Sequence, residues 1–192
     1  EQNIYFLTRQ KLQFEVSQNS LKFDQNFLEQ SSVYFYTSGS TGQPKKIPRT
    51  LAQLFNEVAG LNESFELPEQ AIAIATVSHQ HIYGLLFKLL WPLASGRGFY
   101  QNQVAFPEDV VDVEKKIAHL NIANYVISSP ALLKRWTTDV VLQECITVYS
   151  SGGKLDSGIR PFVNVPITEV FGSSETGGIA HRREDEALWT PF

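Results

Sequence analysis

Two residue types are absent or nearly absent from the sequence, and this bears on which kinds of protein it can be. Methionine is missing from all 192 residues, and cysteine occurs once, at Cys145. A natural chain of this length is expected to carry several methionines and to begin with one, so we expect a piece of a longer protein or the loss of some segments. A single cysteine cannot form a disulfide within the chain, which is typical of a reducing compartment. We therefore expect a cytoplasmic location.

Long hydrophobic runs and an excess of basic charge are also missing. The longest nearly apolar segment, residues 82–94, contains Lys88 and Pro92 and is too short to cross a bilayer. We see no signal peptide and expect no membrane insertion. The formal net charge is -4, and lysine and arginine form no stripe, so we expect no nucleic-acid partner. With 43% hydrophobic and 19% charged residues, the chain is long enough for one globular domain with a real core.

Residues 37–45 are the most informative segment that is present. They combine four hydroxyl side chains with two glycines and end in Lys45, directly after an apolar and aromatic stretch at residues 33–36 that predicts a strand. Main-chain N–H groups at glycines, hydroxyls and the lysine ammonium all donate to phosphate oxygens. The segment predicts a nucleotide triphosphate site, whereas any three of these residues alone would indicate only a polar turn.

The spacing within this segment excludes two common nucleotide-binding loops. The P-loop of NTPases has a wider glycine spacing and places its lysine directly after the second glycine, whereas Lys45 follows Pro44. No Gly-x-Gly-x-x-Gly follows a predicted strand, which removes the usual dinucleotide fingerprint.

Residues 37–45 instead resemble the Thr-Ser-Gly-Ser-Thr-Gly-x-Pro-Lys signature of the adenylate-forming superfamily, which includes acyl- and aryl-CoA synthetases. Three more segments follow in that family's order. Residues 78–85 resemble its histidine-aromatic-glycine segment, residues 151–153 its Ser-Gly-Gly turn, and residues 171–178 its Tyr-Gly-Ser-Thr-Glu-Thr-Gly-Gly segment. The resemblance covers residues 33–191. It implies that residues 1–192 are part of an N-terminal AMP-binding domain and that the lysine-bearing C-terminal domain is absent from the chain.

The resemblance implies roles for individual residues. Glu175, with Thr37, is expected to hold Mg²⁺ beside the phosphates, and Thr176 to donate to the α-phosphate. Phe171 stands where the family usually has a tyrosine that stacks on adenine. The expected catalytic residues are Lys45, Glu175, Thr176 and His81, and the expected nucleotide-binding residues are Thr37, Ser38, Gly39, Ser40, Thr41, Gly42, Ser151, Gly152, Gly153, Phe171, Gly172, Ser173 and Ser174.

Each of these assignments has an ordinary structural alternative. Glu175 could belong to an exposed acidic loop, and a Ser-Gly-Gly sequence alone is more often just a turn. Lys154 follows that turn where the family usually has a small residue, which leaves the lining of the acyl pocket open. Either His79 or His81 could gate the entry of the carboxylate, and a histidine packed in the core is the alternative for each. No acidic or cysteine ligand accompanies the two histidines, so we discount a metal site there.

The reaction implied by the resemblance has two halves. A carboxylic acid reacts with ATP and Mg²⁺ to give an acyl-adenylate and pyrophosphate, and the thiol of coenzyme A then displaces AMP. Two alternatives stay open: transfer to the phosphopantetheine of an acyl carrier protein, and a non-catalytic module that only binds nucleotide. No charged residue demands an amino-acid substrate, so we expect a fatty acyl or aryl acid, although aromatic residues are more often plain core.

The hydrophobic pattern predicts an α/β fold, a mostly parallel sheet flanked by helices. Thr50 is expected to cap a helix that begins at Leu51. One helix is predicted over residues 82–95, ended by Pro92 and Gly96, and a second over residues 108–120, with Glu114 at its surface. The strands are predicted at residues 71–77, 124–127, 147–149 and 168–171. Because ligands bind at the carboxyl ends of parallel strands, we expect the four motifs to meet in one crevice there.

Overall fold

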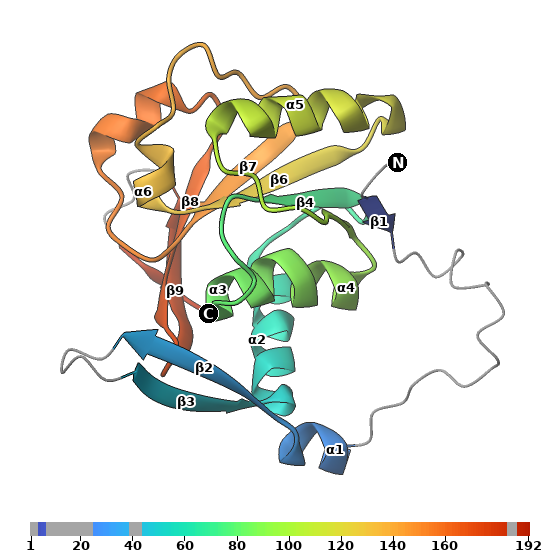
Figure 1. Ribbon diagram of the computed structural model, residues 1–192, viewed down its shortest axis with the longest axis vertical. Coiled ribbons are helices and arrows are strands. Elements are labelled where there is room, and N and C mark those ends of the chain that lie inside the picture. Colours follow the sequence, from blue (N-terminus) through green and yellow to red (C-terminus); the bar gives the residue numbers. More distant parts are fainter. Residues whose placement is uncertain (1–3, 7–24, 39–43, 184–187) are drawn as a thin grey trace, which may run out of the picture.

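Most of the chain folds around one large sheet (Figure 1). The computed structural model describes residues 4–6, 25–38, 44–183 and 188–192. Within these residues eight strands form a sheet of order β1-β5-β4-β6-β7-β8-β9-β10. The strands are β1 (Ile4–Phe6), β4 (Ala71–Ala75), β5 (Gly98–Tyr100), β6 (Ala123–Ser128), β7 (Cys145–Ser150), β8 (Ile167–Ser173), β9 (Gly177–Arg183) and β10 (Thr190–Pro191).

The centre of this sheet is parallel and its edges are antiparallel. Strands β5, β4, β6, β7 and β8 run parallel to one another, whereas β1, β9 and β10 pair antiparallel. All five residues of β4 are buried, as expected for a strand covered on both faces. The predicted α/β fold with a mostly parallel sheet is therefore confirmed.

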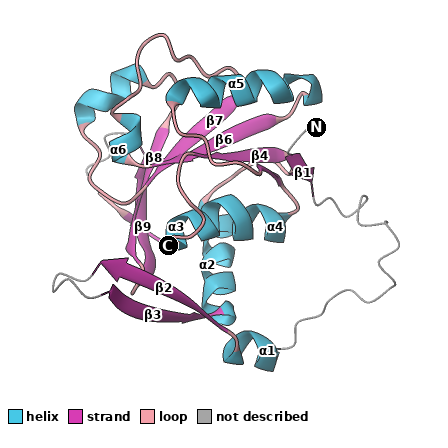
Figure 2. Cartoon of the chain, in the orientation of Figure 1, coloured by secondary structure: helices cyan, strands magenta, loops and turns pink. Residues whose placement is uncertain are grey.

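Helices cover both faces of the sheet, as Figure 2 shows. One face packs against α5 (Pro107–Ile117) and α6 (Pro130–Leu133), and the other against α2 (Leu51–Ser64) and the helical segment from Ile82 to Ser95. Strand β4 divides its side chains between the two cores, with Ile72 and Ile74 toward α5 and the three alanines toward α2. The remaining helices are α1 (Gln25–Gln30) and the 3-10 turns η3 (Ala118–Leu120) and η4 (Ser157–Phe162). Within the part of the chain that is described, none of the helices is both long and apolar enough to span a bilayer.

Helix α2 begins as its sequence predicts. The Thr50 side chain accepts a hydrogen bond from the Gln53 N–H, and the Gln53 side chain accepts one from the Thr50 N–H. This reciprocal capping box satisfies two N–H groups that the first helical turn leaves without partners. Leu54, Val58 and Leu61 are buried at helical spacing, so the predicted apolar stripe is confirmed.

The helix predicted over residues 82–95 is continuous but not uniform. It consists of α3 (Ile82–Gly84), a π-helical stretch η2 (Leu85–Leu90) and α4 (Trp91–Ser95). Pro92 does not end it: the proline is the second residue of α4, directly after the π-helical stretch, and the helical backbone continues through it to Ser95. The chain leaves the helix at Gly96, whose φ of 71° is favourable for glycine.

Two motifs connect antiparallel strands, contrary to the expected strand-turn-helix pattern. Strands β2 (Ser32–Ser38) and β3 (Pro44–Thr50) form a separate two-stranded sheet, so residues 37–45 do not follow a strand of the main sheet. The turn between β8 and β9 likewise closes an antiparallel hairpin. Short glycine-containing segments between two strands can indicate a hairpin, and the sequence-based prediction did not use this signal.

The predicted surface position of Glu114 is wrong. The residue is only 4% exposed and lies on the buried face of α5 with Val110, Val113 and Ile117, its helical neighbours. Its carboxylate accepts hydrogen bonds from the Asn124 side chain and from the main-chain N–H groups of residues 143 and 144. Those donors explain how a charged group is accommodated there.

Candidate functional site

The turn between β8 and β9 is built by reciprocal hydrogen bonds. The Ser173 N–H donates to Thr176 Oγ1 over 3.2 Å, and the Thr176 N–H donates to Ser173 Oγ over 3.2 Å. Gly177 has a φ of 74°, in the left-handed region that favours glycine. Thr176 also donates to the Gly177 carbonyl. These contacts hold Glu175 at the tip of a closed turn.

Glu175 meets Lys45 at this tip. The Lys45 Nζ atom lies 3.0 Å from Glu175 Oε1, and 61% and 44% of the two side chains are exposed. The hydrogen bond from Lys45 lowers the pKa of the Glu175 carboxyl below its usual value, so the group is ionised at neutral pH. The structure thus joins two predicted residues from distant motifs, and both remain accessible to a ligand.

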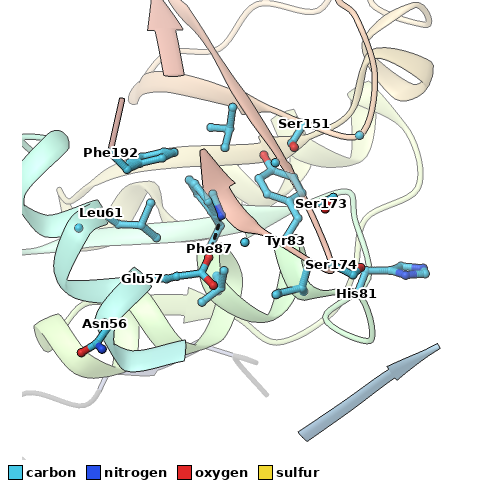
Figure 3. Close-up of a pocket in the computed structure, with 18 of the residues that line it drawn as sticks. Asn56, Glu57, Leu61, His81, Tyr83, Phe87, Ser151, Ser173, Ser174 and Phe192 are labelled. Atoms are coloured by element: carbon cyan, nitrogen blue, oxygen red, sulfur yellow. Dashed lines mark hydrogen bonds between the residues drawn. The ribbon is translucent and has the colours of Figure 1, made fainter. Parts of the chain in front are cut away.

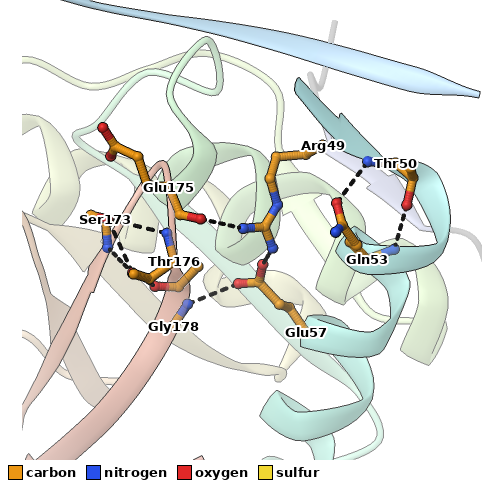
Figure 4. A network of polar contacts seen from close by, with 9 residues as sticks. Arg49, Thr50, Gln53, Glu57, Ser173, Glu175, Thr176 and Gly178 are labelled. Carbon is orange, nitrogen blue, oxygen red and sulfur yellow. Dashed lines mark hydrogen bonds and ion pairs between the residues drawn. The ribbon is translucent and has the colours of Figure 1, made fainter. Parts of the chain in front are cut away.

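A second pair of charges, absent from the sequence-based predictions, lies beside the same turn (Figure 4). Arg49 and Glu57 form an ion pair with 10% and 17% of their side chains exposed. Arg49 also donates to the Glu175 carbonyl oxygen over 3.2 Å, and Glu57 accepts from the Gly178 N–H over 2.9 Å. One sequence signal existed, because Glu57 falls at helical spacing on the buried stripe of α2.

A cavity of about 790 Å³ opens beside this network (Figure 3). Its walls come from α2, the α3 and η2 stretch, the turn after β7 and the β8–β9 hairpin. Six predicted site residues line it: His81, Ser151, Gly152, Gly172, Ser173 and Ser174. Lys45, Glu175, Thr176, Gly153 and Phe171 do not line it.

The lining of the cavity is mostly apolar. Leu61, Ile82, Leu86, Phe87 and Val170 contribute hydrocarbon surface. Its ionisable lining residues are Glu57, Glu63, His81 and Tyr83. Among the described lining residues there is no lysine or arginine. A cavity of this kind suits an apolar ligand with few polar groups.

The histidines and the Ser-Gly-Gly turn have definite places. His79 and His81 are both exposed, so neither is the packed core histidine that the sequence left open. Only His81 lines the cavity, where it precedes the first residue of α3. The Ser-Gly-Gly turn follows β7, and Gly152 has a φ of 88°. It brings main chain to the cavity wall.

Parts of the predicted nucleotide site lie elsewhere or are not described. Thr37 and Ser38, the last residues of β2, pair with Lys45 and Pro44, the first residues of β3. The predicted phosphate-binding residues Gly39, Ser40, Thr41 and Gly42 lie outside the described residues. Phe171 is 55% exposed, and its ring centroid lies 5.7 Å from that of Trp189, so the proposed adenine partner already has one aromatic neighbour.

The residues at the turn fit a magnesium ion that is also bound by phosphates. Glu175 offers an ionised, accessible carboxylate, a ligand that Mg²⁺ prefers. Among the described residues, no three histidine, cysteine, aspartate or glutamate side chains gather into a metal-binding group. A protein site with a single carboxylate matches the way Mg²⁺ is commonly held in nucleotide enzymes, with phosphate oxygens and waters as its other ligands.

The sequence of the chain is similar to those of known proteins. The family described as "AMP-binding enzyme" matches residues 8–191. A 4-coumarate–CoA ligase from Rhodobacter capsulatus is 30% identical over 173 residues, which cover 85% of this chain and 43% of that protein. The medium-chain-fatty-acid–[acyl-carrier-protein] ligase JamA of Moorena producens is 38% identical over 72 residues, 37% of this chain and 12% of JamA.

The fold has solved counterparts as well. The o-succinylbenzoate coenzyme A synthetase of Bacillus subtilis, solved in complex with AMP, superposes with a TM-score of 0.67 at 16% identity. That alignment covers 83% of this chain and 34% of the synthetase, and at this identity it concerns the fold alone. The chain spans less than half the length of each of these relatives.

Proposed function

The chain belongs to the AMP-binding enzyme family, and on that premise we propose that the protein activates a carboxylic acid with ATP and transfers the acyl group to the thiol of coenzyme A. The observation that carries the proposal is the Lys45–Glu175 ion pair, which lies at the β8–β9 turn beside an apolar cavity. The chain then represents part of the N-terminal AMP-binding domain, and the lysine-bearing C-terminal domain lies outside residues 1–192.

In the first half-reaction a carboxylate oxygen attacks the α-phosphorus of ATP. The new bond joins that oxygen to phosphorus, the bond to the bridging oxygen breaks, and pyrophosphate leaves with the electron pair. Lys45 donates to phosphate oxygens, and Thr176 donates to the α-phosphate. Such transfer depends mostly on positioning and on neutralising charge. A bound Mg²⁺, held by Glu175 and Thr37, would supply further positive charge between the phosphates.

The remaining predicted residues serve binding. Thr37, Ser38 and the segment at residues 39–42 receive the phosphates, and Phe171 stacks on the adenine. Ser151, Gly152 and Gly153, with residues 172–174, border the nucleotide and the acyl group. His81, exposed at the cavity wall, gates the entry of the carboxylate. In the second half-reaction the thiol attacks the acyl carbon, and AMP leaves.

The cavity favours a fatty acyl or aryl acid. Its lining is largely hydrocarbon, and the acidic side chain of Glu63 opposes a second carboxylate on the substrate, whereas the charge of Glu57 is balanced by Arg49. Within the described lining no lysine or arginine is available to offset that repulsion. We expect monocarboxylic acids to be used in preference to dicarboxylic acids of equal length.

Acid-dependent exchange of pyrophosphate into ATP tests this function in the full-length natural protein. The exchange should be present with apolar acids and fall by on the order of 100-fold or more in Glu175→Ala. Asp112→Ala is the matched control, because Asp112 is an exposed carboxylate on α5 whose ion pair is with Lys115. Unchanged exchange in Glu175→Ala would rule out the metal role of that residue.

Two other functions are distinguished by this assay together with a second one. Transfer to an acyl carrier protein is supported by the similarity to the carrier-protein ligase JamA; it would give the same exchange, and a separate assay of thioester formation would then show a faster second step with the carrier than with coenzyme A. A non-catalytic module would bind ATP or AMP without any exchange.

A further inference from the structure

Arg49 and Glu57 occupy an unusual position for a buried ion pair. They join the end of β3 to the middle of α2, and each also contacts the main chain of the β8–β9 turn. We propose that Arg49 and Glu57 are positioning residues that fix the Glu175 turn relative to the phosphate-binding hairpin, so that Glu175 is oriented for the metal ion of a bound nucleotide. The proposal rests on the proposed function and assigns roles to two residues outside the motifs.

The guanidinium of Arg49 acts as a bridge. One of its terminal nitrogens, Nη2, pairs with Glu57 Oε1, and the other, Nη1, donates to the Glu175 carbonyl oxygen over 3.2 Å. The planar fork of an arginine can serve two acceptors at once in a fixed geometry, which a lysine ammonium does not reproduce. The main chain of Glu175 is thereby tied to β3.

Glu57 secures the other side of the turn. Its Oε2 atom accepts from the Gly178 N–H over 2.9 Å. A Cβ atom at residue 177 would lie 2.2 Å from Glu57 Oε1, so the carboxylate packs directly against Gly177. The turn that carries Glu175 and Thr176 is therefore held at its tip and after it by one ion pair.

Strand β3 connects Arg49 to Lys45. Lys45 and Arg49 are four residues apart on β3 and project from the same face of the strand. Lys45 contacts the Glu175 side chain and Arg49 contacts its carbonyl oxygen. A displacement of the turn would thus break both contacts together.

Stability alone is a weak explanation for the pair. The cost of removing two charges from water offsets much of their attraction, so a buried ion pair often stabilises a fold little compared with apolar side chains. The contacts that distinguish this pair are those to the main chain of a turn that bears a candidate metal ligand.

The test uses variants of the full-length natural protein. Arg49→Lys keeps the charge but loses the fork, and Glu57→Gln keeps the shape but loses the charge. The double variant Arg49→Leu with Glu57→Leu removes both charges and should stay folded, because apolar replacement of a buried pair is often neutral for stability. Asp112→Asn is the control, since it neutralises an exposed carboxylate elsewhere.

Hydrogen–deuterium exchange of the peptide covering residues 173–178 is the first readout. Without ligand, its amides should exchange about tenfold faster in the three network variants and unchanged in Asp112→Asn. Unchanged exchange of this peptide in the folded double variant would overturn the proposal.

The second readout is the factor by which Mg²⁺ tightens ATP binding, measured by calorimetry. It should fall about tenfold in Arg49→Lys and in the double variant, because a misplaced turn weakens metal binding. A full Mg²⁺ effect despite a loosened turn would overturn the positioning role. ATP binding without acid-dependent pyrophosphate exchange in the unaltered protein would refute the catalytic function alone, whereas absence of ATP binding would refute both.

Discussion

The ammonium nitrogen of Lys45 lies 3.0 Å from a carboxylate oxygen of Glu175, although 130 residues separate the two along the chain. Lys45 belongs to β3 of the small hairpin, and Glu175 belongs to the turn between β8 and β9. The pair therefore joins the two sheets of the molecule at an accessible position. The opposite charges neutralise each other in the absence of a ligand, and a metal-bound nucleotide would offer each of them a stronger partner.

Replacing Lys45 by methionine should change how Glu175 titrates. The pKa of this carboxyl is held below 4.5 by Lys45, so the ion pair is complete at neutral pH and is lost as the pH falls from about 4.5 through the lowered pKa. In Lys45→Met the midpoint should move upward toward 4.5. Carbon-13 NMR of the Glu175 carboxyl against pH measures the midpoint, and the same value in both proteins would contradict a direct contact.

The sequence predicted the partners in this contact but not how the chain brings them together. The apolar spacing after Thr50 and the alternation of hydrophobic and polar segments depend on local order, and they correctly predicted α2 and the parallel sheet. Pairing of β2 with β3 and of β8 with β9 is local in sequence, but it was missed because the glycine-containing segments between these strands were interpreted as turns that lead into helices. Arg49 and Glu57 were missed because charged residues usually face solvent, and their contacts to the β8–β9 turn depend on tertiary packing.

Substitution of Gly177 by alanine should destabilise the protein. Its φ of 74° costs a residue with a side chain about 1–2 kcal/mol, and the added carbon would collide with the Glu57 carboxylate. Urea denaturation should show a lower free energy of unfolding.

Gly60→Ala is a control for which we expect the opposite change in the free energy of unfolding. Gly60 lies inside α2, and a Cβ atom there would meet nothing within 4 Å. Gly60→Ala should stabilise the fold by about 0.5–1 kcal/mol, because alanine loses less backbone entropy in a helix. Equal effects of the two substitutions would argue against the strained geometry of the turn.

Removal of the Glu114 carboxylate should destabilise the fold. In Glu114→Ala the buried Asn124 side chain and two main-chain N–H groups lose their acceptor, which should lower the free energy of unfolding by about 2–3 kcal/mol. Asp112→Ala on the exposed face of α5 should change it by less than about 0.5 kcal/mol. Urea denaturation of both variants measures the difference, and similar values would contradict the buried role of Glu114.

Cys145 should resist alkylation in the native protein. Burial raises the pKa of its thiol to about 12, so almost no thiolate is present at pH values near 8. Iodoacetamide labelling of the Cys145 peptide, followed by mass spectrometry, should be slow in buffer and fast in denaturant. Equally fast labelling in both would show that the thiol is accessible.

The hairpin formed by β2 and β3 closes through pairs of residues that are near one another in sequence, from Ser38 and Pro44 to Ser32 and Thr50. During synthesis from the N-terminus, these strands can pair long before the β8–β9 turn has left the ribosome. The part of the proposed site that contains Lys45 is thus made early, and the Glu175 carboxylate that pairs with Lys45 follows 130 residues later in the chain. A nascent chain that stops short of Glu175 would expose Lys45 and Arg49 without their partner in that turn, and it could not assemble the site.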